Sequence, residues 1–220
     1  MKILMRFSAC WVSSAAFLIG GTCYGQGFVN LNFESANVSG YSVGSAIPAS
    51  KAFPGWTVSA NYVYYDNISL SGDSVSIIDA NDPASYPPLQ GKYFALLVAA
   101  TSTYPNYGPI SISQTGEIPA SAESITFWGE DTGLQVTFAG QPLTFSAIGT
   151  TPNYTIYEAD ISAFAGQTGQ LLFTAAPFSG GGQIDNIQFS SSPVPEPGAL
   201  ALAGIGAALA GVGFRRKSFK

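Results

Sequence analysis

Short runs of β-branched and aromatic residues, separated by glycine, proline, asparagine and aspartate, fill the middle of this chain and constrain its fold. In Ile110–Ser113 and Val136–Phe138 apolar side chains take every second position, as one buried face of a sheet requires. No alternation of strands with helices appears along the chain. We therefore predict an all-β, antiparallel, jelly-roll-like sandwich over residues 26–189.

The predicted strands share high β propensity and end at turn-forming residues. They are Phe28–Phe33, Trp56–Ser59, Ser74–Asp79, Tyr93–Val98, Ile110–Gln114, Ser124–Trp128, Leu134–Phe138, Leu143–Ile148, Tyr154–Glu158, Gln170–Thr174 and Gln183–Phe189. We interpret Asp131–Gly133 as a hairpin turn between the two runs beside it. The one predicted helical turn is Ala159–Ala165, with Asp160 placed to cap it.

The first 25 residues have the features of a secretory signal peptide. Lys2 and Arg6 form a positive start, residues 7–21 are apolar and small, and small residues precede Gln26. Cleavage before Gln26 is the expected outcome, and an uncleaved membrane anchor is the alternative.

The other end of the chain is predicted to cross a membrane once. A linker at residues 190–197 precedes an apolar helix at 198–214 and a basic tail at 215–220. Seventeen helical residues span about 25 Å at ~1.5 Å each, which is enough for a thin bilayer. Because basic clusters stay in the cytoplasm, the sandwich is expected on the far side of the inner membrane.

Pro195, Glu196 and Pro197, the apolar helix and the pair Arg215 and Arg216 together resemble the PEP-CTERM sorting signal of Gram-negative bacteria. The resemblance implies that an exosortase-type enzyme recognises and processes the tail. It also implies a final location at the cell surface or in the extracellular matrix. The prolines keep this strip extended, which suits a protease. The alternative is a permanent single-pass anchor.

The residue inventory excludes several functions. The chain has no histidine, and both cysteines, Cys10 and Cys23, lie in the predicted signal peptide. Histidine-based triads, histidine-ligated metals and thiol nucleophiles are therefore absent from the predicted domain. Between residues 26 and 192 two lysines face twelve carboxylates, a formal charge of −10. Such a surface repels phosphate backbones, so no nucleic-acid partner is expected.

The segments Asn30–Glu34, Pro54–Trp56 and Ile184–Ile187 loosely resemble galactose-binding-like jelly rolls and carbohydrate-binding modules. In those folds the first and last strands are neighbours, and an acidic pair there shares a structural Ca²⁺. The resemblance therefore implies Glu34 and Asp185 as calcium ligands. The alternative is two ordinary carboxylates that bond to turns and backbone.

Exposed tyrosines are the candidate ligand-binding residues. Tyr62 and Tyr64 share one face if their segment is extended, while Tyr104 and Tyr107 lie in a predicted loop. Sugar rings stack on aromatic faces, and phenols add polar groups. The alternative is that these tyrosines only fill sheet positions. Trp56 and Trp128 are expected in the core.

The sequence thus predicts a non-enzymatic, exported surface or matrix protein that binds polysaccharide. A purely structural or adhesive protein that contacts other proteins is the first alternative. A carbohydrate-active enzyme is the second, and the lack of a convincing acid pair disfavours it.

Overall fold

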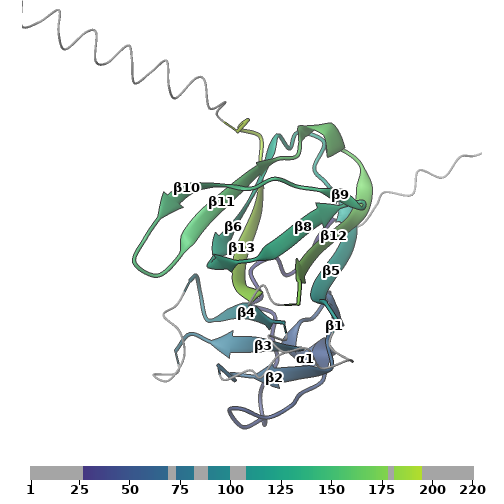
Figure 1. Cartoon of the computed structure of the whole chain (residues 1–220). Helices are drawn as coiled ribbons and strands as arrows, with labels where there is room; N and C mark the ends of the chain where they lie inside the picture. The colour runs from purple at the N-terminus through teal and green to yellow at the C-terminus, as the bar shows by residue number, and fades with distance from the viewer. Residues whose placement is uncertain (1–26, 69–72, 82–88, 100–107, 178–180, 195–220) are drawn as a thin grey trace, which may run out of the picture.

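The structure is a computed structural model that describes residues 27–68, 73–81, 89–99, 108–177 and 181–194 (Figure 1). The predicted signal peptide, transmembrane helix and basic tail lie outside these ranges. None of the helices within them is long and apolar enough to cross a membrane. The elements are α1 (Ala49–Ala52), β1 (Thr57–Ser59), β2 (Tyr62–Tyr65), β3 (Ser74–Asp79), β4 (Tyr93–Val98), β5 (Ile110–Glu117), β6 (Ser124–Gly129), β7 (Asp131–Thr132), β8 (Leu134–Phe138), β9 (Gln141–Pro142), β10 (Ser146–Thr150), β11 (Thr155–Asp160), η1 (Ser162–Phe164), β12 (Thr168–Ala175) and β13 (Gly181–Ser190).

The strands form two sheets, which confirms the all-β sandwich. The smaller sheet has the order β1-β5-β12-β8-β9, and the larger has the order β10-β11-β6-β13-β4-β3-β2, with β7 beside β13. All of the pairs that the structure describes are antiparallel except β2 with β3, which run parallel. The predicted antiparallel pattern therefore fails at one edge of the larger sheet.

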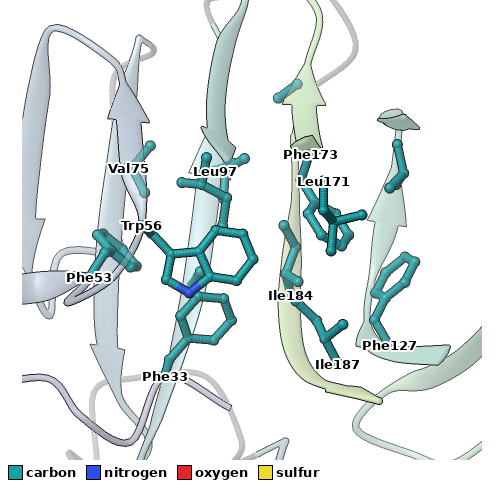
Figure 2. Packing of buried hydrophobic residues seen from close by; sticks show 14 of the residues in the cluster. Phe33, Phe53, Trp56, Val75, Leu97, Phe127, Leu171, Phe173, Ile184 and Ile187 are labelled. Carbon is teal, nitrogen blue, oxygen red and sulfur yellow. The ribbon is translucent and has the colours of Figure 1, made fainter. Parts of the chain in front are cut away.

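The main core lies between the two sheets. Val75, Leu97 and Ile184 of the larger sheet face Leu171 and Phe173 of the smaller one, all buried (Figure 2). Because alternate residues of a strand point to opposite faces, each strand gives every second side chain to this core. Burial of apolar surface there contributes about 25 cal/mol per Å².

An aromatic group closes one side of this core. The Phe33 ring centroid lies 5.5 Å from that of Trp56 and 6.0 Å from that of Phe53 (Figure 2). Trp56 is buried, as predicted, and its indole N–H donates to the carbonyl of Asn30 over 3.0 Å. This hydrogen bond fixes the segment around Asn30, which precedes α1 and is not a strand, to the sandwich.

A second apolar cluster lies on the outer face of the larger sheet. Ile78 of β3 and Phe94 and Leu96 of β4 are buried there against Leu89, and Tyr154 packs against the same group. The larger sheet is therefore covered on both faces around β3 and β4. This explains why all six side chains of β3 are buried.

Among the sequence-based predictions of local structure, the first strand and one hairpin turn are wrong, and the predictions Leu143–Ile148 and Ala159–Ala165 match only in part β10 and η1. Residues 28–33 form turns instead of a first strand, since Asn30 and Phe33 adopt positive φ angles of 50° and 57°. Asp131–Gly133 is not a hairpin turn, because β6 belongs to the larger sheet and β8 to the smaller one. There the backbone of β7 pairs with Gly181 and Gly182 while the chain crosses between sheets.

Candidate functional site

Tyr62 and Tyr64 form a stacked pair on the outer face of β2. Their ring centroids lie 6.0 Å apart with an interplanar angle of 28°. The alternate residues Val63 and Tyr65 pack against the core instead. Tyr62 is 58% exposed. The predicted common face of Tyr62 and Tyr64 is therefore present, and it presents aromatic surface to solvent.

Strand β2 is held on both sides. Its partner on one side is β3, with Tyr62 opposite Ser74 and Tyr64 opposite Ser76. On the other side the amide of Ile47 donates to Val63 O over 2.9 Å, and that of Gly44 donates to Tyr65 O over 2.8 Å. The backbone of the tyrosine pair is therefore fixed by hydrogen bonds on both sides.

The remaining predicted tyrosines, Tyr104 and Tyr107, lie outside the described residues. The sorting residues Pro195, Glu196, Pro197, Arg215 and Arg216 lie outside them as well.

Trp128 is not in the core, contrary to expectation. On β6 the alternate residues Ile125 and Phe127 face the core, so Trp128 lies on the outer face and is half-buried. Its ring stacks on Tyr154, with centroids 4.4 Å apart and an interplanar angle of 7°. Alternate residues of a strand face opposite sides, so the positions of Ile125, Phe127 and Trp128 in the sequence could have predicted that Trp128 faces outward.

Glu34 and Asp185 both bind the segment that leads into β4. Glu34 Oε1 accepts hydrogen bonds from the backbone N–H groups of Lys92 over 2.7 Å and Tyr93 over 2.9 Å. Asp185 Oδ2 accepts one from Gln90 over 2.9 Å, and its Oδ1 accepts one from Asn186 over 2.7 Å. The predicted proximity of the two carboxylates thus arises through residues 90–93, although Glu34 lies in a turn.

The environment of Asp185 disfavours a negative charge. The side chain is completely buried, and desolvation raises the pKa of its carboxyl to about 8. The hydrogen bonds from Asn186 and Gln90 oppose this rise, and the charge of Glu34 adds to it. A positive charge near Asp185 would lower the pKa of its carboxyl. The Lys92 ammonium group pairs with another carboxylate instead, since its Nζ lies 3.4 Å from Asp79 Oδ2.

One oxygen in the segment that Asp185 binds is available to a hard cation. The Gln90 Oε1 atom is buried and has no hydrogen-bond partner among the described residues, and the backbone N–H of Gln90 donates to Asp185. Carboxylate and amide oxygens are the ligands that Ca²⁺ prefers, in sets of six to eight. In the part of the chain that the structure describes, no three His, Cys, Asp or Glu residues gather as a metal cluster. Backbone carbonyls and water would have to complete such a site.

Comparison with solved structures finds three proteins of low sequence identity. The structure of TmCBM61 in complex with β-1,4-galactotriose is 21% identical, covers 75% of this chain and 98% of its own, and has a TM-score of 0.41. A family 11 carbohydrate-binding module from Clostridium thermocellum, in complex with a β-1,3-1,4-mixed-linked tetrasaccharide, is 12% identical, with coverage of 70% and 99% and a TM-score of 0.36. The enzymatically active domain of tailspike protein 4 from bacteriophage CBA120 is 15% identical, with coverage of 62% and 19% and a TM-score of 0.36.

Comparison of sequences identifies the tail. No curated protein sequence matches the chain. Residues 193–217 match the family described as the PEP-CTERM protein-sorting motif. The matched segment includes Pro195–Pro197 and the basic pair Arg215 and Arg216. The chain therefore carries a PEP-CTERM sorting motif, which implies an exported protein that is sorted to the cell surface and processed by an exosortase.

Proposed function

We propose that the sandwich is a non-enzymatic surface domain that binds a neutral polysaccharide on the tyrosine pair of β2. The exposed, stacked rings of Tyr62 and Tyr64 carry this proposal. Their faces offer apolar contact to the C–H groups of a pyranose, and the phenol groups offer hydrogen bonds to its hydroxyls. Because β2 is held on both sides, little ordering entropy is lost on binding.

The charge of the domain selects the kind of polymer. With a formal charge of −10 between residues 26 and 192, the domain repels uronic-acid or phosphate-bearing chains at moderate ionic strength. A neutral polysaccharide meets no such penalty. An exported, surface-sorted protein also meets extracellular polymers where it resides.

Affinity electrophoresis of the released protein tests the proposal. We expect gels that contain neutral β-glucan, galactan or mannan to retard the protein in at least one case, and gels with polygalacturonate to leave it unretarded. Tyr62→Ala should weaken the interaction about tenfold, or ~1.4 kcal/mol. The fold should tolerate this change because Tyr62 is largely exposed.

Ile148→Ala is the matched control. Ile148 is 51% exposed on β10, at the opposite edge of the same sheet, so its truncation removes similar apolar area away from the tyrosines. It should leave retardation unchanged. If no neutral polymer retards the wild-type protein, the structural or adhesive alternative replaces polysaccharide binding. Equal loss in both variants would contradict the assignment to β2.

The buried carboxylate supports a second proposal, a structural Ca²⁺ held by Asp185, Glu34 and Gln90 Oε1. A dication there would stabilise the ionised form of Asp185, occupy an amide oxygen that has no partner among the described residues, and lower the self-repulsion of an acidic domain. Its role would be to fix residues 90–93 against the last strand. It would not take part in chemistry.

The finer course of maturation is also a proposal. The mature protein would begin at Gln26 and end near Pro195–Pro197, after loss of the signal peptide and of the helix at residues 198–214. The domain would then rest at the cell surface or in the extracellular matrix, having left the inner membrane.

A further inference from the structure

A cavity of about 420 Å³ opens at one end of the sandwich, apart from the tyrosine pair. Its walls come from both sheets: Val58, Ser59, Ala60, Asn61, Asp73, Gly108, Pro109 and Ile110 line it. Alternation places Asn61 and Asp73 with Val63 and Val75, toward the inner side of the larger sheet, while Tyr62 lies on the outer side. The volume is within the range of small-molecule sites, roughly 300–1,000 Å³.

Asp73 and Asn61 give this cavity its polar character. The Asp73 side chain is only 3% exposed, and its Oδ2 accepts a hydrogen bond from Asn61 Nδ2 over 3.3 Å. The backbone N–H of Asn61 also donates to Asp73 O over 3.0 Å. This double link joins the starts of the parallel strands β2 and β3, so both polar groups are held in place before any ligand arrives.

We propose that this cavity binds one neutral hexopyranose unit of the polysaccharide. A carboxylate accepts hydrogen bonds from hydroxyl groups, the asparagine amide both donates and accepts, and the partly buried Val58 and Ala60 add a small apolar contact for the C–H groups of a sugar. The same carboxylate repels an acidic sugar. The inference rests on the proposed polysaccharide function and adds to it a second contact that recognises a single sugar.

The cavity lies at the end of the domain opposite Ser190, where β13 ends. Leu97 pairs with Gly182 at the start of β13 and with Val75 of β3, two residues after Asp73. Strand β13 then runs ten residues to Ser190, which pairs with Ser124. In Figure 1 the described chain ends near β6, β11 and β9, whereas β1, β2 and β3 lie at the other end. A domain held by its C-terminus would therefore present the cavity outward.

Isothermal titration calorimetry of the released protein with methyl glycosides tests the proposal. The probes are methyl β-glucoside, methyl β-galactoside and methyl α-mannoside, with glucuronate as the acidic comparison. We expect a Kd of about 1–10 mM for at least one neutral probe and no heat from glucuronate.

Two substitutions test whether the measured heat of binding arises in the cavity. Ser59→Lys adds a long cationic side chain at a residue that lines the cavity, and it should weaken binding more than ~10-fold. Ser59 is exposed, so this variant should fold. Thr57→Lys is the charge-matched control, because Thr57 is exposed on the same strand and does not line the cavity. Asp73→Asn, which keeps the shape, should weaken binding by a similar factor.

The outcomes separate this proposal from the previous one. Loss in Ser59→Lys and Asp73→Asn, with binding retained in Thr57→Lys and Tyr62→Ala, supports the cavity. Absence of heat for all three neutral probes, or binding that persists in Ser59→Lys, overturns it. If a neutral polysaccharide still retards the protein in gels while the methyl glycosides fail, the tyrosine pair stands and the cavity does not.

Discussion

The backbone N–H of Gln90 donates to the Asp185 carboxylate over 2.9 Å, across 95 residues of sequence. This bond joins the segment before β4 to the middle of β13 at a fully buried acid. Because water is excluded, the pKa of Asp185 rises to about 8, even though two N–H groups donate to the carboxylate. The pair therefore makes the stability of the domain dependent on pH.

In the presence of a chelator, wild-type stability should fall relative to Asp185→Asn as pH rises. An unfolded Asp titrates near pH 3.9, whereas the folded pKa is about 8, so folding favours the protonated acid. The contribution of Asp185 is fully present below about pH 4 and is lost as pH rises toward 8. Thermal melts of both proteins from pH 4 to pH 9 measure this. A constant difference between their melting temperatures would contradict a raised pKa.

Calcium should raise the melting temperature at neutral pH. At one hundred times Kd a ligand of the native state adds ~2.7 kcal/mol, a shift of several degrees for a domain of this size. Magnesium should add less, because it requires a tighter octahedral shell. Asp185→Asn should remove the calcium increment, and Glu123→Gln, which removes an exposed carboxylate, should retain it. Equal melting in calcium and in chelator at matched ionic strength argues for two ordinary carboxylates.

The intact mass of the released protein should lack residues 1–25 and the segment 198–220. An exosortase is expected to cut near Pro195–Pro197, since two prolines keep that strip out of the following helix. Glu196→Ala should leave the chain in the inner membrane, as seen by fractionation and mass spectrometry. Recovery of a surface form that still contains the tail would show that the tail is an anchor.

Strands that are flanked on both sides by turn-forming residues could be predicted from the sequence with the correct bounds. Ser74–Asp79, Tyr93–Val98 and Leu134–Phe138 have the predicted bounds, because each alternating or continuous apolar run ends at turn-forming residues. Residues 28–33 have similar composition but form turns. There the Val29 amide donates to Gln114 Oε1 from β5, a tertiary contact that local sequence does not contain.

The sheet to which each strand belongs, and the residues that line the cavity, could not be predicted from local sequence patterns. The parallel contact of β2 with β3 depends on which strands meet at an edge, and periodicity does not report this. The common face of Tyr62 and Tyr64 follows from alternation alone, whereas the link between Asn61 and Asp73 requires the two strand starts to be adjacent. Tyr62, Tyr64, Glu34 and Asp185 were candidates from the sequence, whereas the roles of Asn61, Asp73 and Gln90 depend on topology and were missed.

Gly91→Ala should destabilise the protein more than Gly40→Ala. Both glycines have positive φ, 61° and 84°, so each variant bears the backbone cost of an alanine there, ~1 kcal/mol. A Cβ at Gly40 meets no atom within 4 Å, while one at Gly91 overlaps the Glu34 carboxylate. Glu34 must then turn away and release the amides of Lys92 and Tyr93.

The loss of these two charge-assisted hydrogen bonds should make Gly91→Ala about 2 kcal/mol worse than Gly40→Ala in urea unfolding with an unchanged slope. In a Glu34→Ala background the overlap is gone and no bonds remain to be lost. The two glycine variants should then cost the same, and this double-mutant cycle isolates the Glu34 contact from the backbone effect. If Gly91→Ala and Gly40→Ala already cost the same in the wild-type background, Glu34 does not hold the segment before β4. Its proposed share in the calcium site would then fail with it.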